Sequence, residues 1–190
     1  MKLLEDKIIS DGTVLSGNIL KVGSFLNQQL DTVFLTKMGE EIKRIYAADC
    51  VTKILTIEAS GIAIATAAGI VMEVPVVFAK KNKSANVTGE VYTAKVYSFT
   101  HKKEYTVTIP KEYLKSEDRI VIVDDFLANG KALEGLIDII RQSGATLVGA
   151  TCAIEKGFQG GGDSLRAEGV RVESLAIVDD MSGGNIKFRK

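Results

Sequence analysis

The stretch RIVIVDDFLANGKAL, residues 119–133, decides the fold. Its first five residues predict an apolar strand, which ends on two adjacent carboxylates, Asp124 and Asp125. A loop of small residues follows and leads into a helix at Gly130. Backbone amides approach a ligand closely where side chains are small, and the start of a helix favours an anion. The segment therefore predicts a phosphate site beside two carboxylates that suit ribose hydroxyls or a magnesium ion.

Other phosphate and nucleotide motifs fit this segment less well. Gly130 and Lys131 resemble the end of a P-loop, but Ala132 stands where that motif needs Ser or Thr, and Asp125 where it needs its first glycine. The dinucleotide motif GxGxxG does not follow any predicted strand. The alternative without a ligand is a strand that ends in a capping aspartate and an ordinary tight turn.

Outward from this segment, apolar runs alternate with helical patterns. Such alternation predicts an α/β fold with a mainly parallel sheet flanked by helices, whose sites lie at the carboxyl ends of the strands. The first third is expected to be largely helical, except for an irregular stretch over 18–30. Residues 157–163, GFQGGGD, predict a loop near a strand end. The expected strands are 53–57, 75–79, 119–123, 146–154 and 170–178, and the expected helices are 61–73 and 130–143, the second capped by Gly144.

Residues 80–110 interrupt the alternation and predict a two-stranded β-hairpin flap. Six lysines lie between Lys80 and Lys103, against one acid, Glu90. One interpretation is that this basic flap faces an anionic ligand. The other is that the lysines protect the exposed edge of a solvated antiparallel ribbon. Both remain open from the sequence.

Bulk properties restrict the class of protein. The chain of 190 residues suits a single domain, and 24 basic residues balance 24 acidic ones, so no net charge favours nucleic acid. Cys152 lies in an apolar run and is expected to be a buried thiol; the lone His101 does not support a zinc cluster or a serine–histidine hydrolase. Neither a signal peptide nor a membrane-length apolar run is visible, so we expect a cytoplasmic protein without membrane partners.

The segment 119–133 resembles the signature of the type I phosphoribosyltransferases, and the resemblance extends from MKLLEDKI through ANGKA to GFQGGG, over nearly all of the chain. It implies that Asp124 and Asp125 are catalytic residues at the ribose hydroxyls. Most members have hydroxyl residues where this chain has Ala128 and Lys131, so backbone amides are expected to carry phosphate binding. The implied residues that bind phosphoribosyl diphosphate are Ala128, Asn129, Gly130, Lys131, Ala132, Glu58, Ala59, Ser60 and Lys81, with Lys80 and Lys83 as further candidates.

The resemblance also implies a reaction and its partners. The phosphoribosyl group would pass from phosphoribosyl diphosphate to xanthine, with magnesium carried by the diphosphate rather than by a protein metal site. The base would meet Leu20, Asn27 and Lys156, with residues 1–30 as a small N-terminal hood and 80–110 as a flexible flap. Taken alone, Lys156 also fits a surface lysine and Asn27 a turn residue, and Phe158 fits either a purine-stacking or a core aromatic.

The resemblance leaves two alternatives and one further expectation. Guanine–hypoxanthine or adenine transfer is the alternative within the enzymes. A regulator that senses phosphoribosyl diphosphate and binds RNA or DNA is the alternative of another class. A homodimer with small-molecule substrates is the expected assembly.

Overall fold

A computed structural model describes residues 1–16, 18–81, 89–98 and 103–190 of the chain. The described strands of the main sheet run in the order β10-β9-β8-β7-β3-β4-β6-β5, and the five from β9 to β4 are mutually parallel. This confirms the predicted mainly parallel sheet. The strands are β3 (Lys53–Ile57), β4 (Val76–Lys81), β5 (Val91–Ser98), β6 (Lys103–Pro110), β7 (Arg119–Leu127), β8 (Thr146–Lys156), β9 (Val172–Asp180) and β10 (Lys187–Phe188).

Strand β7 lies at the centre of the sheet because its residues are apolar on both faces. Residues 120–123 are completely buried, and β7 pairs with β3 on one side and β8 on the other. The strand extends beyond the predicted 119–123, because its pairing with β8 continues as far as Leu127 opposite Glu155. Asp124 and Asp125, the sixth and seventh of the nine strand residues, therefore lie within the strand rather than after it.

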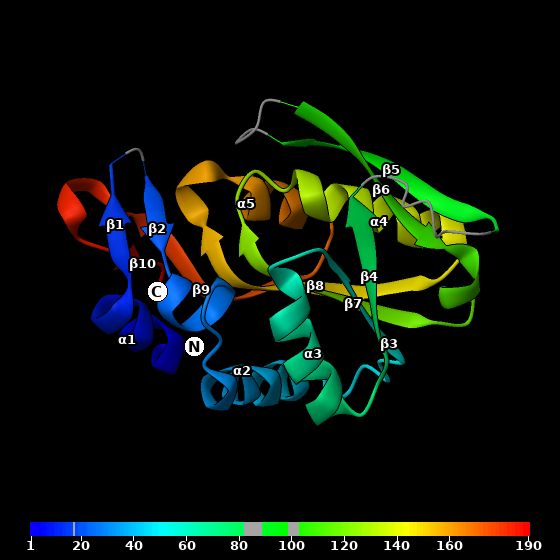
Figure 1. Cartoon of the computed structure of the whole chain (residues 1–190), viewed down its shortest axis with the longest axis horizontal. Helices are drawn as coiled ribbons and strands as arrows, with labels where there is room; N and C mark the ends of the chain where they lie inside the picture. The colour runs from blue at the N-terminus through cyan, green and yellow to red at the C-terminus, as the bar shows by residue number, and fades with distance from the viewer. Residues whose placement is uncertain (17, 82–88, 99–102) are drawn as a thin grey trace.

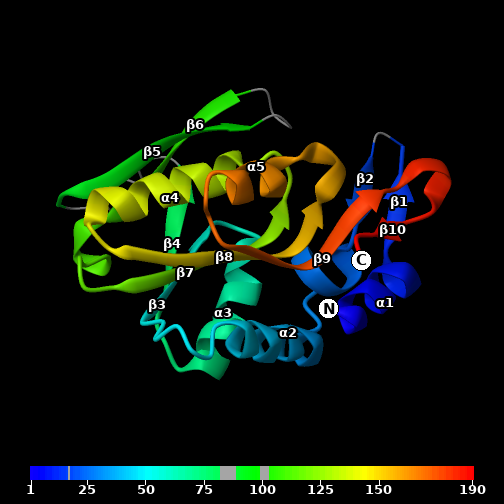
Figure 2. The same cartoon turned by 180° about the vertical axis from the view of Figure 1, so that it is seen from behind.

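Helices cover both faces of the sheet (Figures 1 and 2). The helices α2 (Thr32–Ile45) and α3 (Gly61–Met72) pack on one face, and α4 (Lys131–Ser143) and α5 (Gly161–Ala167) on the other. Helix α4 buries one apolar stripe and ends at Gly144, whose φ of 75° is the predicted left-handed cap. Among the described residues, no helix is both long and apolar enough to cross a bilayer.

The N-terminal hood is more regular than the sequence predicts. It comprises α1 (Lys2–Asp11), the hairpin strands β1 (Thr13–Leu15) and β2 (Ile19–Lys21), and a π-helical turn, Gly23–Asn27. The prediction of an irregular stretch over 18–30 is thus wrong for β2 and the turn. Three-residue strands carry too short a pattern to be recognised from sequence. Figure 1 places the hood beside β10, so the two ends of the chain lie at the same side of the molecule.

The flap strands β5 and β6 form the predicted antiparallel ribbon, but their described part belongs to the main sheet. Strand β6 pairs with the end of β4, which itself extends to Lys81, inside the range predicted for the flap. The ribbon also buries Val96 and Val107 against α4. Lys95 pairs with Glu104 across the ribbon at 3.0 Å, which favours the edge-protection interpretation for this lysine. Lys83, His101 and Lys102 lie outside the described residues.

The segment after β8 differs from the predicted loop. A short 3-10 turn, Gly157–Gln159, leads into α5, which begins at Gly161 inside the glycine-rich run. Glycine is required there by packing: a Cβ on Gly161 would lie 2.4 Å from the carbonyl oxygen of Ala128. Gly161 thus passes directly behind the loop that joins β7 to α4, whereas a Cβ on Gly162 would meet Glu155.

Candidate active site

The paired acids occupy different environments at the carboxyl end of β7. Asp124 is 4% exposed, and its Oδ1 accepts a 2.9 Å hydrogen bond from the amide of Asp125. Burial first, and then the neighbouring charge of Asp125, raise the pKa of Asp124 well above its ordinary value. Asp124 is therefore the carboxyl of the pair that resists ionisation, and Asp125 is the more exposed of the two.

The loop from Ala128 to Ala132 has the backbone of an anion site. Gly130 has φ +84°, which orients the chain into α4, and the Asn129 Oδ1 accepts a 3.2 Å hydrogen bond from the Lys131 amide. The loop thus places amides and the start of a thirteen-residue helix beside the paired acids. The Lys131 Nζ lies 2.8 Å from both carboxylate oxygens of Glu134, so its charge is already paired.

The second predicted loop, Glu58–Ala59–Ser60, joins β3 to α3 next to the acids. Gly61 allows the approach, since a Cβ there would lie 2.3 Å from the Thr56 Oγ1 and 2.4 Å from the Asp124 Oδ1. The buried Thr56 hydroxyl has no hydrogen-bond partner among the described residues. The amide of Lys81 donates to the Glu58 Oε1 at 2.5 Å, which joins the end of β4 to this loop. Glu58, Ala59, Ser60 and Lys81, four of the predicted residues, thus lie at one edge of the sheet.

Two of the three predicted base-binding residues point polar groups toward the same region. Asn27 donates from Nδ2 to the Asp125 Oδ2 at 3.3 Å, across 98 positions of sequence. Lys156 donates from Nζ to the Asn18 carbonyl at 3.3 Å and lies 5.7 Å from the centre of the Phe126 ring. Burial lowers the pKa of Lys156. Leu20 differs, because its side chain is only 6% exposed and belongs to the hydrophobic core.

Phe158 does not belong to the core, so that interpretation of the residue is wrong. Its side chain is 37% exposed on the turn after β8. Cys152, by contrast, is completely buried as predicted, and burial raises the pKa of its thiol. Stacking of Phe158 on a purine stays a prediction.

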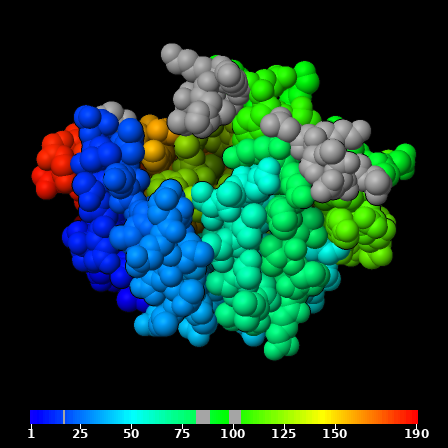
Figure 3. Space-filling model, in the orientation of Figure 1, coloured from blue at the N-terminus to red at the C-terminus, as the bar shows by residue number. Residues whose placement is uncertain are grey.

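A hollow opens on the surface beside the hood. Figure 3 shows it between the blue N-terminal segment and the cyan-to-green one, with yellow-green and orange segments at its floor. A cavity of about 610 Å³ adjoins Asn27, Ala59 and Ser60 and continues between α2 and α3 to Leu30 and Ile70. Away from Asn27, Ala59 and Ser60, the walls of the cavity are mainly apolar. The cavity therefore adjoins the predicted site only at the end formed by these three residues.

A group of charged residues behind the site was missed by the sequence analysis. Glu155 is completely buried at the end of β8 and is paired with Arg166 of α5. The spacing of Asp163 and Arg166, three apart on a helix, was the one local signal. Their link to Arg189, 26 residues from Asp163, has no local signature.

Comparison with known proteins agrees with this geometry. Residues 36–164 match the model of the family described as the phosphoribosyl transferase domain. The chain is 53% identical over 191 residues to the xanthine phosphoribosyltransferase of Lachnoclostridium phytofermentans, covering 100% of this chain and 98% of that protein. It is 55% identical over 192 residues to the protein of the same name from Bifidobacterium longum, with 100% of both covered.

Solved structures share the fold at low sequence identity. The adenine phosphoribosyltransferase of Giardia lamblia, complexed with 9-deazaadenine, superposes with a TM-score of 0.77 at 18% identity, covering 92% of this chain and 96% of that one. The enzyme of Saccharomyces cerevisiae gives a TM-score of 0.74 at 17% identity, covering 92% and 99%. These likenesses show the fold. With the matched domain and the relatives at about half identity, they establish that the chain belongs to the phosphoribosyltransferase family and has the type I fold.

Proposed function

We propose that this protein transfers the phosphoribosyl group of phosphoribosyl diphosphate to xanthine, giving xanthosine monophosphate and diphosphate in purine salvage. One observation supports the proposal: at the end of β7, Asp125 accepts a hydrogen bond from Asn27 and the ring of the next residue, Phe126, lies 5.7 Å from the Lys156 Nζ, just before the loop 128–132. The relatives at about half identity over the full chain, which bear the name xanthine phosphoribosyltransferase, support the choice of base.

The two loops divide the sugar phosphate between them. Backbone amides from Ala128 to Ala132, with the start of α4, bind the ribose phosphate, while Glu58–Ala59–Ser60 and Lys81 face the diphosphate. The ammonium of Lys81 lies 5.4 Å from the centre of the Tyr105 ring. Asp125 accepts hydrogen bonds from the ribose hydroxyls, since its side chain is half-buried, whereas Asp124 is buried and burial disfavours its charge.

Magnesium fits this site as a partner of the substrate. The half-buried carboxylate of Asp125 is a hard oxygen ligand of the kind magnesium prefers, and oxygens of phosphoribosyl diphosphate would supply most of the coordination. When bound, the ion would neutralise charge on the leaving diphosphate as a Lewis acid. A ring nitrogen of the purine then forms the new bond to the anomeric carbon as the bond to diphosphate breaks, with inversion. The ring N–H proton leaves to solvent.

The base site is matched to a dioxopurine. The carboxylate of Asp125 only accepts hydrogen bonds, so the amide nitrogen of Asn27 faces it and the Asn27 carbonyl is left to accept from a ring N–H. Lys156, whose burial already disfavours its charge, donates to an oxo group. Adenine presents no oxo group to Lys156 and would leave that cation unpaired, which a site built for the bond rejects strongly.

The decisive experiment measures diphosphate release from phosphoribosyl diphosphate and magnesium with xanthine, guanine, hypoxanthine and adenine supplied separately. We expect turnover with xanthine well above that with the other three. A preference for another purine would keep the mechanism and discard the xanthine assignment. Binding of phosphoribosyl diphosphate without turnover on any base would favour the sensor, which salt-dependent binding to RNA would then test.

The predicted cytoplasmic location and homodimer stay proposals. The cavity between α2 and α3 supports the dimer: Ile70 and Leu30, at its outer end, are 73% and 46% exposed, and its inner end reaches Asn27. A second copy packed there would cover apolar surface and close one side of the site.

A further inference from the structure

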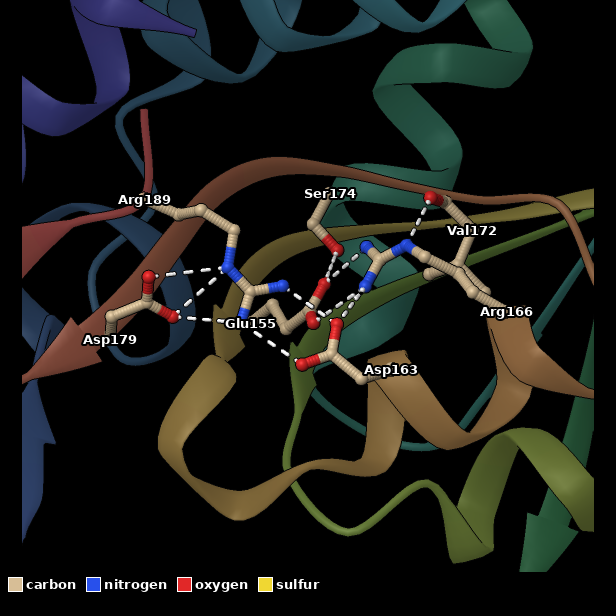
Figure 4. Close-up of polar contacts among 7 residues, drawn as sticks. All are labelled: Glu155, Asp163, Arg166, Val172, Ser174, Asp179 and Arg189. Carbon is tan, nitrogen blue, oxygen red and sulfur yellow. Dashed lines mark hydrogen bonds and ion pairs between the residues drawn. The ribbon is translucent and has the colours of Figure 1, made fainter.

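Arg189, the residue that follows the C-terminal strand β10, joins three separate elements behind the site. Figure 4 shows its guanidinium between two carboxylates. Arg189 donates from Nη1 and Nη2 to Asp163 at 2.7 and 3.0 Å, and from Nε and Nη2 to the Asp179 Oδ1 at 3.1 and 2.8 Å. Its own amide donates to the Ile177 carbonyl at 2.8 Å. The side chain thus connects β10 with α5 and with the end of β9.

The connection continues into a buried ion pair. Arg166 donates to the same carboxylate of Asp163 at 3.1 Å and, through two parallel bonds of 2.9 and 2.7 Å, to Glu155. Ser174 donates at 2.5 Å to the Glu155 Oε2, the oxygen that also accepts the 2.7 Å bond from Arg166. A completely buried carboxylate needs such partners, and the planar fork of arginine supplies them with defined geometry. The network therefore fixes α5 against β8 and β9.

The fixed segment touches the phosphate loop directly. The amide of Gly161, the first residue of α5, donates to the Ala128 carbonyl at 3.2 Å. A Cβ on Gly161 would lie 2.4 Å from backbone atoms of Asn129 and Gly130, and one on Gly162 would lie 2.1 Å from the Glu155 Oε1. There is no spare space between the ion-pair network and the loop. A shift of α5 therefore displaces the loop backbone.

We propose that Arg189 is a positioning residue for phosphoribosyl diphosphate: it holds α5, and through Gly161 it sets the backbone of the loop that binds the ribose phosphate. Arg189 does not touch the substrate. Lys156 is adjacent to Glu155 and pairs with Val178 of β9, so its backbone is held by the sheet as well as by the network. The proposal rests on the proposed function, because it takes the loop to bind the phosphate of that substrate.

The test compares three variants by steady-state kinetics. Arg189→Met removes the fork while keeping the length of the side chain, and we expect the KM for phosphoribosyl diphosphate to rise on the order of tenfold, because a displaced phosphate loop binds less well. The KM for xanthine should stay within about twofold. Arg189→Lys keeps the charge and loses the fork, so its KM for phosphoribosyl diphosphate should lie between those of the unaltered protein and Arg189→Met. Lys187→Met is the control, since Lys187 is 74% exposed and contacts Asp180 at 3.3 Å from strand β10.

A role in stability alone predicts a different result. It would lower the melting temperature and the fraction of active enzyme, and so kcat, with both KM values unchanged; that outcome overturns the proposal. Equal increases in both KM values overturn it as well. Hydrogen exchange of the amides over 157–162, measured without substrates, should be faster in Arg189→Met than in Lys187→Met. If the unaltered protein proves inactive on xanthine, the proposed function fails, and the exchange and the calorimetric affinity for phosphoribosyl diphosphate still decide the role of Arg189.

Discussion

The buried carboxylate of Asp124 opposes folding at neutral pH. Burial raises its pKa in the folded protein above the value of about 4 in the unfolded chain, so its unfavourable contribution is absent below the unfolded pKa and complete above the folded one. Asp124→Asn keeps an oxygen to accept the Asp125 amide and removes the charge. We expect the free energy of unfolding at pH 7 to rise by about 1–2 kcal/mol, a gain that vanishes near pH 3–4.

Denaturant unfolding across this pH range, together with turnover, checks the Asp124 prediction. Activity should fall at least about tenfold, because the amide nitrogen cannot accept a hydrogen bond from a ribose hydroxyl. Asp125→Asn is the matched comparison: it should lose activity without the gain in stability, since Asp125 is only half-buried. A lower free energy of unfolding in Asp124→Asn would contradict the prediction that the charge of Asp124 opposes folding.

Lys156 should discriminate between the two substrates. Lys156→Ala removes a half-buried cation that faces the base region, and we expect the KM for xanthine to rise about 10- to 100-fold, the worth of one charge-assisted hydrogen bond. The KM for phosphoribosyl diphosphate should change little. Lys95→Ala on the flap is the control, because Lys95 is 75% exposed and paired with Glu104. Equal increases in the KM values for both substrates would contradict the assignment of Lys156 to the base site.

Among the elements, a single glycine of α4, Gly135, allows the flap strand β5 to pack closely on the helix. A Cβ on Gly135 would lie 2.5 Å from the Val96 Cγ2 and 3.7 Å from the Ala94 Cβ, so the ribbon packs directly on the helix backbone. Helix propensity alone predicts that Gly135→Ala stabilises by about 1 kcal/mol. We expect the opposite, a loss of about 1–3 kcal/mol from overpacking.

A double-mutant cycle separates the two effects on α4. Gly135→Ala combined with Val96→Ala should be less destabilised than the sum of the single variants, because the shorter side chain makes room for the new methyl group. Urea unfolding of the four proteins provides the free energies. Strict additivity would show that the ribbon moves away from α4 at little cost.

For the whole molecule, the exposed end of the cavity between α2 and α3 bears on assembly. Ile70→Asp places a charge on a side chain that is 73% exposed, so the folded monomer should be unaffected. If a second copy covers this surface, the variant should sediment at half the mass of the unaltered protein at micromolar concentration, because an unpaired charge cannot be buried in an interface. Ile9→Asp, on α1 and 60% exposed, is the control. Identical masses for both variants would place the contact elsewhere.

Local pattern determined much of the fold. The order of strands and helices around β7, the glycine cap of α4, the antiparallel flap and the small-residue loop between β7 and α4 follow from periodicity, turn chemistry and small residues within about fifteen positions. These features depend on neighbours along the chain, whose physical preferences can be read directly. The family resemblance added the residues that we propose for the base site, which no local pattern indicates.

Only the tertiary structure decided which distant groups meet. The contact of Asn27 with Asp125, the pairing of Glu155 with Arg166, and the position of Arg189 between Asp163 and Asp179 depend on the order of strands in the sheet. Short strands such as β2, and α5 within a glycine-rich run, form because neighbouring elements pack on them. The sequence by itself determined the elements and the chemistry of their ends; the folded chain decided which charges are buried and paired, because burial depends on every element at once.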